Sequence, residues 1–121
     1  MSDIFPVLFV AHMLGDWVLQ TDKQATTKMS SWRAMAAHVL TYHLGMVVLV
    51  LPFWHDQWAV LGFLLSAGTH GFIDRRWPVQ WLLQKTGSAK FAESQLGMLS
   101  ADQALHAFVL GLLAVMYQVT R

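Results

Sequence analysis

Residues 66–74 read Ser-Ala-Gly-Thr-His-Gly-Phe-Ile-Asp, end an apolar segment, and place a histidine and an aspartate four residues apart. On an α-helix this spacing puts both side chains on one face, about one turn apart. His12 and Asp16 show the same spacing near the N-terminus, and Asp102 and His106 show it in reverse order. The fold and the function are therefore inferred from where these pairs lie in the chain.

The composition indicates a membrane protein. Of the 121 residues, 55% are hydrophobic and 12% are charged, whereas about a quarter of the residues of a soluble domain are charged. The mean hydropathy is +0.43. A net charge of +1 without a basic stripe argues against nucleic-acid binding, and the absence of cysteine excludes disulfides and thiolate metal sites. We expect one domain over residues 1–121, with the lipid bilayer as its partner.

Four apolar segments are each about 17–20 residues long, which suits helices that span a bilayer. They cover residues 4–20, 32–51, 58–74 and 100–119. Ser30 or Ser31 is expected to cap the second segment, and Ser100 with Gln103 has the capping-box spacing that starts the fourth. Residues 79–84 (VQWLLQ) predict a short amphipathic segment at the membrane surface. The predicted fold is all-α, with four transmembrane helices arranged as two helical hairpins.

Positive charges decide the predicted orientation. The connection between segments two and three has no Lys or Arg, whereas the connections on either side of it carry Lys23, Lys28, Arg33, Arg75, Arg76, Lys85 and Lys90. By the positive-inside rule, both basic connections face the cytoplasm and both termini lie outside. The predicted location is the bacterial inner (cytoplasmic) membrane, as a multi-pass protein for which a homo-oligomer is an open alternative.

This topology brings ionisable side chains of all four segments to a similar depth. At 1.5 Å per residue, His38, His70 and His106 each lie about 7–9 Å inside the cytoplasmic ends of their segments. Because a carboxylate facing lipid is unfavourable, Asp16 and Asp74 should point into the bundle and be paired there. We therefore expect the histidines and aspartates to converge.

The same residues form an internal repeat. Segments one and three each carry His-x-x-x-Asp, and segments two and four each carry a histidine near the start, His38 and His106. Since each repeat holds two segments, both halves would have the same orientation in the membrane, as two parallel hairpins.

Imidazole and carboxylate groups one turn apart can bind a divalent metal ion, with zinc expected and manganese or iron as alternatives. The predicted metal ligands are His12, Asp16, His38, His70, Asp74, Asp102 and His106. Three of them, Asp16, Asp74 and His38, are also the predicted catalytic residues. Structural alternatives stay open: Asp74 can pair with Arg75 or Arg76, and Asp102 can complement the dipole of a first helical turn.

Residues 11–20 read AHMLGDWVLQ and contain an H-x-x-x-D-aromatic-x-x-Q pattern, followed by Lys23, Lys28 and a helix that begins near His38. In these features the chain resembles a family of small bacterial and phage integral-membrane proteins classed as a domain of unknown function. Residues 69–74 and 102–106 fit the same family, so the resemblance covers most of the chain and implies a membrane location. At the level of fold the chain is also similar to membrane-bound metal-dependent hydrolases, which build sites from His and Asp on spanning helices.

Two functional hypotheses follow. The first is a metal-dependent hydrolase that acts on a lipid or lipid-linked substrate at the cytoplasmic face, where a metal-bound water attacks the scissile group. The second is a non-enzymatic phage- or bacterium-encoded membrane interaction protein whose His/Asp network is structural. A haem-binding bundle and an ion pathway are further alternatives.

Overall fold

The structure, a computed structural model, describes residues 4–19 and 26–121. Its elements are α1 (Ile4–Met13), the π-helical turn η1 (Leu14–Val18), α3 (Trp32–Val50), α4 (Gln57–Asp74), α5 (Trp77–Lys85), α6 (Ala89–Glu93) and α7 (Gln95–Val119). The described residues contain no strand, which confirms the all-α prediction. Gln20 and Lys23, which belong to the sequence pattern of the resemblance, lie outside the described residues.

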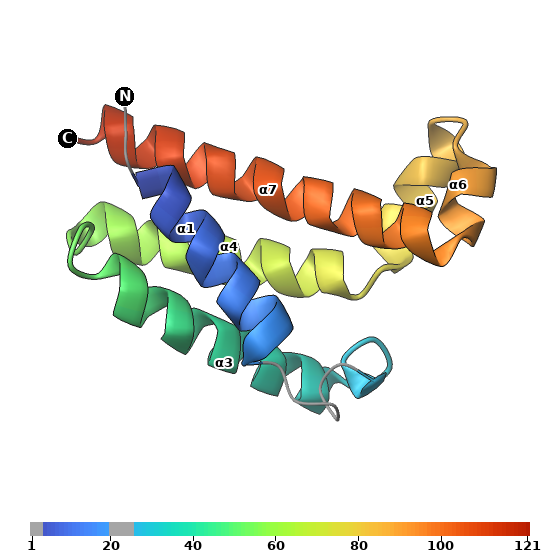
Figure 1. Ribbon diagram of the computed structural model, residues 1–121, viewed down its shortest axis with the longest axis horizontal. Coiled ribbons are helices and arrows are strands. Elements are labelled where there is room, and N and C mark those ends of the chain that lie inside the picture. The colour runs from blue at the N-terminus through green and yellow to red at the C-terminus, as the bar shows by residue number, and fades with distance from the viewer. Residues whose placement is uncertain (1–3, 20–25) are drawn as a thin grey trace.

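Four helices form a bundle in which each packs against two others. α1 contacts α3 and α7, and α4 contacts the same two helices from the other side (Figure 1). The helices therefore form two successive pairs, α1 with α3 and α4 with α7. The short helices α5 and α6 lie at one end of the bundle, and both chain termini lie at the other end.

Side-chain caps explain two of the helix starts. The hydroxyl of Ser31 accepts a hydrogen bond from the backbone N–H of Ala34, so the predicted cap of the second helix is confirmed. Asp56 accepts from the first two backbone N–H groups of α4 and from the indole N–H of Trp54, which fixes the tight turn between α3 and α4. As a result, α4 begins one residue before the predicted segment.

The predicted start of the last helix is wrong. α7 begins at Gln95, because the Ser94 hydroxyl accepts a hydrogen bond of 2.8 Å from the backbone N–H of Gly97 and caps the helix there. The capping box expected at Ser100 is therefore interior to the helix. Asp102 consequently lies beyond the first turn, so the helix dipole does not account for its carboxylate.

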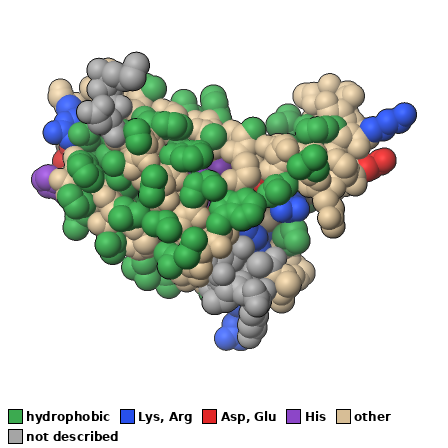
Figure 2. Space-filling view, viewed as in Figure 1, with side chains coloured by type: hydrophobic (Ala, Val, Ile, Leu, Met, Phe, Trp, Pro, Cys, Tyr) green, Lys and Arg blue, Asp and Glu red, His purple; other side chains and the backbone are tan. Residues whose placement is uncertain are grey.

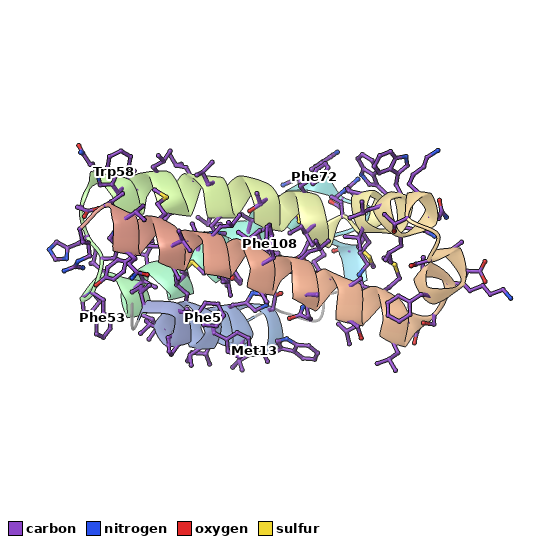
Figure 3. All side chains as sticks on the ribbon, turned by 90° about the horizontal axis from the view of Figure 1, so that it is seen from above. Phe5, Met13, Phe53, Trp58, Phe72 and Phe108 are labelled. Carbon is purple, nitrogen blue, oxygen red and sulfur yellow. The ribbon has the colours of Figure 1, made fainter. Side chains whose placement is uncertain are left out.

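The bundle is apolar outside and carries its ionisable groups inside. Phe5, Phe72 and Phe108 project outward from α1, α4 and α7 and are 37%, 58% and 64% exposed (Figure 3). The space-filling view shows hydrophobic side chains over most of the bundle face (Figure 2). Inside, Leu110 belongs to an apolar cluster near the chain termini, and Met98 belongs to another beside α5 and α6. Between these two apolar clusters, α7 carries polar residues that face inward.

Two helices among the described residues are long and apolar enough to cross a membrane, α3 and α7. Only 28% of the residues in each apolar window are buried. Residues 4–18 form a shorter apolar helix, and α4 is outside the set that meets the test. The four-span topology expected from the sequence is therefore not confirmed by helix length and hydropathy.

The close contact between η1 and α3 depends on Gly15. A methyl group added there would overlap the Tyr42 ring, so we expect Gly15→Ala to destabilise the fold by about 1–3 kcal/mol, as overpacking does. The measurement is thermal unfolding of the detergent-purified protein. Gly111→Ala is the control, because no described atom outside its own helix lies within 4 Å of the added carbon. Equal melting temperatures for the two variants would contradict the close packing of η1 on α3.

Candidate metal centre

The structure brings all seven predicted site residues together in the bundle interior. Each is at most 8% exposed, and they form three overlapping groups that could hold a metal ion. The groups are Asp16, His38, His70 and Asp74; then His12, Asp16 and His106; and finally Asp74, Asp102 and His106. Asp16 and Asp74 are each shared by two groups, so they form the middle of the cluster.

The first group has the geometry of a tetrahedral site. His38 Nε2 and His70 Nε2 lie 2.9 Å apart. Asp16 Oδ1 lies 3.2 and 3.3 Å from these two nitrogens, and Asp74 Oδ2 lies 2.8 and 3.2 Å from them. Zinc with ligands at 2.0–2.2 Å has neighbouring ligands about 3.3–3.5 Å apart, so these distances are close to those around one ion. The residues present therefore fit a divalent cation.

Local structure explains how Asp16 reaches this position. It lies in η1, where the helix widens into a π-helical turn directly after α1. Such turns often occur at functional sites, because the extra residue per turn re-aims side chains. Gly15 lets this turn lie against the ring of Tyr42 on α3. The sequence spacing predicted that His12 and Asp16 share a face, but it did not predict the π-helical geometry.

His106 has a lone pair directed into the cluster. Its Nδ1 lies 2.8 Å from the backbone oxygen of Asp102 and 2.8 Å from Asp102 Oδ1, so Nδ1 carries the proton. Nε2 is then an acceptor, and it lies 3.3 Å from another acceptor, Asp74 Oδ1. Neither atom has a hydrogen-bond partner among the residues that the structure describes. A carboxylate that orients a histidine in this way is typical of metal sites.

Two neighbours of His12 were not predicted to belong to the site. The Tyr42 hydroxyl lies 2.8 Å from His12 Nδ1, and Gln103 Oε1 lies 2.9 Å from His12 Nε2. Since an amide oxygen only accepts, Nε2 donates to Gln103 and the tyrosine hydroxyl donates to Nδ1. Tyr42 also stacks on His70, with ring centroids 4.0 Å apart. Its position one helical turn after His38 is the sequence signal that could have identified it.

The basic residues pair differently from the sequence expectation. Asp74 does not pair with Arg75 or Arg76; instead, Lys28 Nζ lies 2.8 Å from Asp74 Oδ2. Arg75 lies over the ring of Trp32, and Arg76 Nε lies 3.7 Å from Asp102 Oδ2. Lys28 belongs to the polar connection before α3, and no sequence pattern relates it to Asp74. An ammonium group therefore contacts one of the oxygens that could ligate a metal.

Two remaining histidines lie outside these three groups. His43 is 2.8 Å from the Val39 backbone oxygen and 2.9 Å from the Ser66 hydroxyl, which is an interhelical contact. His55 is exposed in the turn between α3 and α4.

A polar opening reaches the cluster from the surface. It has a volume of about 310 Å³ and is lined in part by Asp16, Lys28, Arg76, Asp102 and Gln103. Water and a polar ligand group can approach the cluster through this opening.

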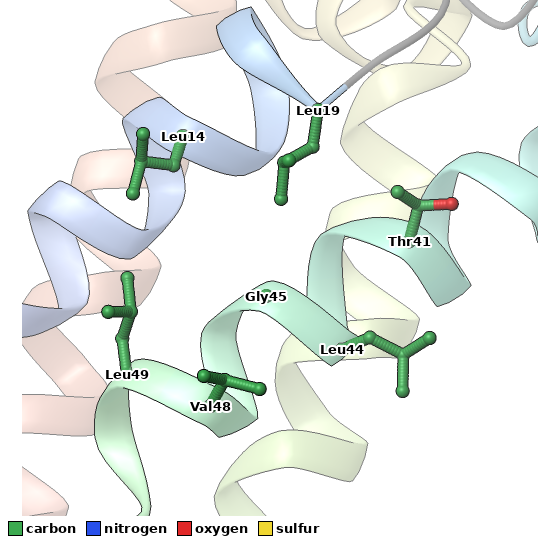
Figure 4. Close-up of a pocket in the computed structure, with 7 residues that line it drawn as sticks. All are labelled: Leu14, Leu19, Thr41, Leu44, Gly45, Val48 and Leu49. Carbon is green, nitrogen blue, oxygen red and sulfur yellow. The ribbon is translucent and has the colours of Figure 1, made fainter.

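An apolar groove lies beside η1, on the lipid-like exterior of the bundle. It has a volume of about 430 Å³ and is lined by Leu14, Leu19, Thr41, Leu44, Gly45, Val48 and Leu49 (Figure 4). Leu14 and Leu19 of the first chain segment face the α3 residues across the groove. Asp16 lies between these two leucines in the sequence, so the polar cluster and the groove share the same short segment.

Comparison with known proteins identifies one family. The family model described as a protein of unknown function, DUF3307, matches residues 4–121. No curated protein and no solved structure matches the chain.

Removal of the Tyr42 hydroxyl tests the hydrogen bonds of His12. We expect Tyr42→Phe to destabilise the fold by about 1–3 kcal/mol, because it leaves the buried His12 Nδ1 without a donor while the stacking on His70 remains. Chemical unfolding of the purified protein measures this change. Tyr117→Phe is the control, since the Tyr117 hydroxyl meets only the exposed Arg121 among the printed contacts near the C-terminus. A loss no larger than that of the control would contradict a buried hydrogen bond at His12.

Proposed function

Because the chain belongs to the DUF3307 family, whose function is unknown, its own site has to indicate its chemistry, and we propose that it is a metal-dependent membrane hydrolase. The observation that carries this proposal is the tetrahedral arrangement of His38, His70, Asp16 and Asp74, with distances of 2.8–3.3 Å between their ligand atoms. A divalent ion bound there would lower the pKa of a water ligand and polarise a scissile ester or similar group.

The residues of the chain have distinct roles in this proposal. His38 and His70 supply neutral nitrogen ligands, and the two aspartates supply oxygens that offset the charge of the ion. Asp16 lines the polar opening, so it is the ligand that an entering water meets first. Asp102 holds His106 in a fixed orientation through Nδ1, which makes Asp102 a positioning residue in place of the ligand expected from sequence.

The surface of the bundle supports a membrane location. In a soluble protein, long apolar helices are mostly buried, whereas α3 and α7 expose most of their apolar windows. Leu40, Leu44 and Val48 on one face of α3 are 62%, 60% and 72% exposed. Apolar surface of this extent favours contact with lipid. We therefore place the whole four-helix bundle in the membrane, with α1 and α4 as its shorter spans.

Charge and the apolar groove suggest the substrate. Lys28 and Arg76 line the opening, and the basic connections lie at the end of the bundle away from the chain termini. The positive-inside rule places this end at the cytoplasmic face of a bacterial inner membrane. The polar group of a lipid or lipid-linked substrate would enter the opening, and its alkyl chain would lie in the groove that begins at Leu14 and Leu19.

One observation favours the structural alternative. Lys28 contacts Asp74 Oδ2 at 2.8 Å, and Gln103 and Tyr42 satisfy both nitrogens of His12. In a non-enzymatic interaction protein, these contacts would stabilise the bundle without a metal ion. Metal content and the response of Lys28 variants to metal separate the two functions.

Metal analysis is the first test. We expect the protein, purified in detergent without chelators, to contain a divalent metal that inductively coupled plasma mass spectrometry detects. His70→Ala should lose metal from the tetrahedral site and lose hydrolysis of lipid substrates, because one of four ligands is removed. His55→Ala is the matched control, since His55 lies in the exposed turn between α3 and α4. Metal-free wild-type protein that takes up no zinc or manganese on titration would overturn the proposed function.

Replacement of Lys28 separates a metal site from an ionic network. In metal-free protein, Lys28→Met should lower the melting temperature, because removal of one partner of a buried ion pair costs about 3–5 kcal/mol. Added zinc should then restore stability and bind more tightly than in the wild type, since Nζ no longer competes for Asp74 Oδ2.

Lys90→Met, on the exposed surface of α6, is the control for the lost positive charge. If Lys28→Met loses stability and zinc does not restore it, the contact between Lys28 and Asp74 is purely structural.

A further inference from the structure

The bundle has an approximate internal symmetry that relates its histidines and aspartates. The first repeat contributes His12 and Asp16 on α1 and η1, with His38 on α3; the second contributes His70 and Asp74 on α4, with His106 on α7. In the ring of packed helices, α1 is opposite α4, and α3 is opposite α7. A half-turn about the bundle axis therefore exchanges the two sets of residues.

This symmetry applied to the tetrahedral group generates a second group. His38 becomes His106, His70 becomes His12, and the two aspartates exchange with each other. The second group is therefore His12, His106, Asp16 and Asp74. Its members do lie together: His12, Asp16 and His106 have ligand atoms within 4.8 Å of one another, and His106 is 3.3 Å from Asp74.

Each aspartate presents a different oxygen to each group. Asp16 directs Oδ1 toward His38 and His70, and its Oδ2 is the oxygen 3.7 Å from His12 Nε2. Asp74 directs Oδ2 toward His38 and His70, and its Oδ1 is the oxygen 3.3 Å from His106 Nε2. Two carboxylates with one oxygen on each side are the arrangement of a bridged pair of metal ions, as in the dimetal carboxylate sites of helix bundles.

An independent observation shows a place for a cation in the second group. Asp74 Oδ1 and His106 Nε2 are both buried, both without a hydrogen-bond partner among the described residues, and both acceptors once the His106 proton is on Nδ1. Two acceptors 3.3 Å apart repel unless a proton or a cation lies between them. The residues that carry them are 1% and 3% exposed, so bulk water does not solvate these atoms.

We propose that the protein binds a second divalent cation between His106, Asp74, Asp16 and His12, so that Asp16 and Asp74 bridge two ions. The inference rests on the proposed metal site and deepens it. His12 would join as a ligand when its Nε2 exchanges Gln103 for the ion, while Tyr42 continues to hold Nδ1. Two ions held in this way would lie about 3.5–4 Å apart, the spacing that clamps the attacking and leaving oxygens of a hydrolysed ester.

The experiment loads metal-free protein with manganese chloride and measures metal content together with the electron paramagnetic resonance spectrum. Wild-type protein should bind about two ions per chain and show a spin-coupled spectrum, because bridging carboxylates couple neighbouring Mn²⁺ ions. His106→Ala should bind about one ion and show the uncoupled six-line signal. His106→Gln is the second variant, since it keeps a polar side chain of similar length if the alanine variant does not fold.

His55→Ala should keep both ions and the coupled spectrum, because its side chain lies in the exposed turn far from the two groups in sequence and structure. One ion per chain in the wild type, or an unchanged stoichiometry in both His106 variants, would overturn the second site and leave the first in place. A wild-type protein that binds no ion would overturn the proposed function as well.

Discussion

The structure depends on the burial of two aspartates, Asp16 and Asp74, inside a bundle whose outer surface is apolar. Their exposed fractions are 8% and 1%, so water offsets little of their charge. A buried carboxylate is tolerated only when it is paired and hydrogen-bonded. Imidazoles from all four bundle helices and the ammonium group of Lys28 converge on these two groups. The helices therefore pack where they can deliver these partners to the carboxylates.

Much of this arrangement could be predicted, because helical periodicity and the cost of charge in lipid both act on single residues. The i, i+4 spacing of His70 and Asp74 fixes a shared face whatever the tertiary structure is. The equal depth of His38, His70 and His106 follows from helix rise alone. Both arguments are local in the chain, so an alignment or a fold was not needed to bring these residues together.

The features that escaped prediction depend on competition between local signals or on contacts distant in sequence. Ser94 and Ser100 are both acceptable caps, and only the packing of α6 on α7 selects the earlier one. Gln103 was consequently assigned to a helix start, although its amide faces His12. Lys28 reaches Asp74 across 46 positions of sequence, and nothing in the composition of a polar connection indicates such a contact.

The two halves of the centre differ in their surroundings more than in their ligands. One turn before His38 on α3 is Ala34, whereas the equivalent position before His106 on α7 is Asp102; likewise, Met35 corresponds to Gln103. Asp102 and Gln103 line the polar opening, while Met35 is 3% exposed and His38 is 0% exposed. The α3 side is thus closed by apolar packing, and the α7 side is hydrated. In a two-ion centre, the ion between His38 and His70 would organise the site, and the ion beside His106 would meet water and substrate.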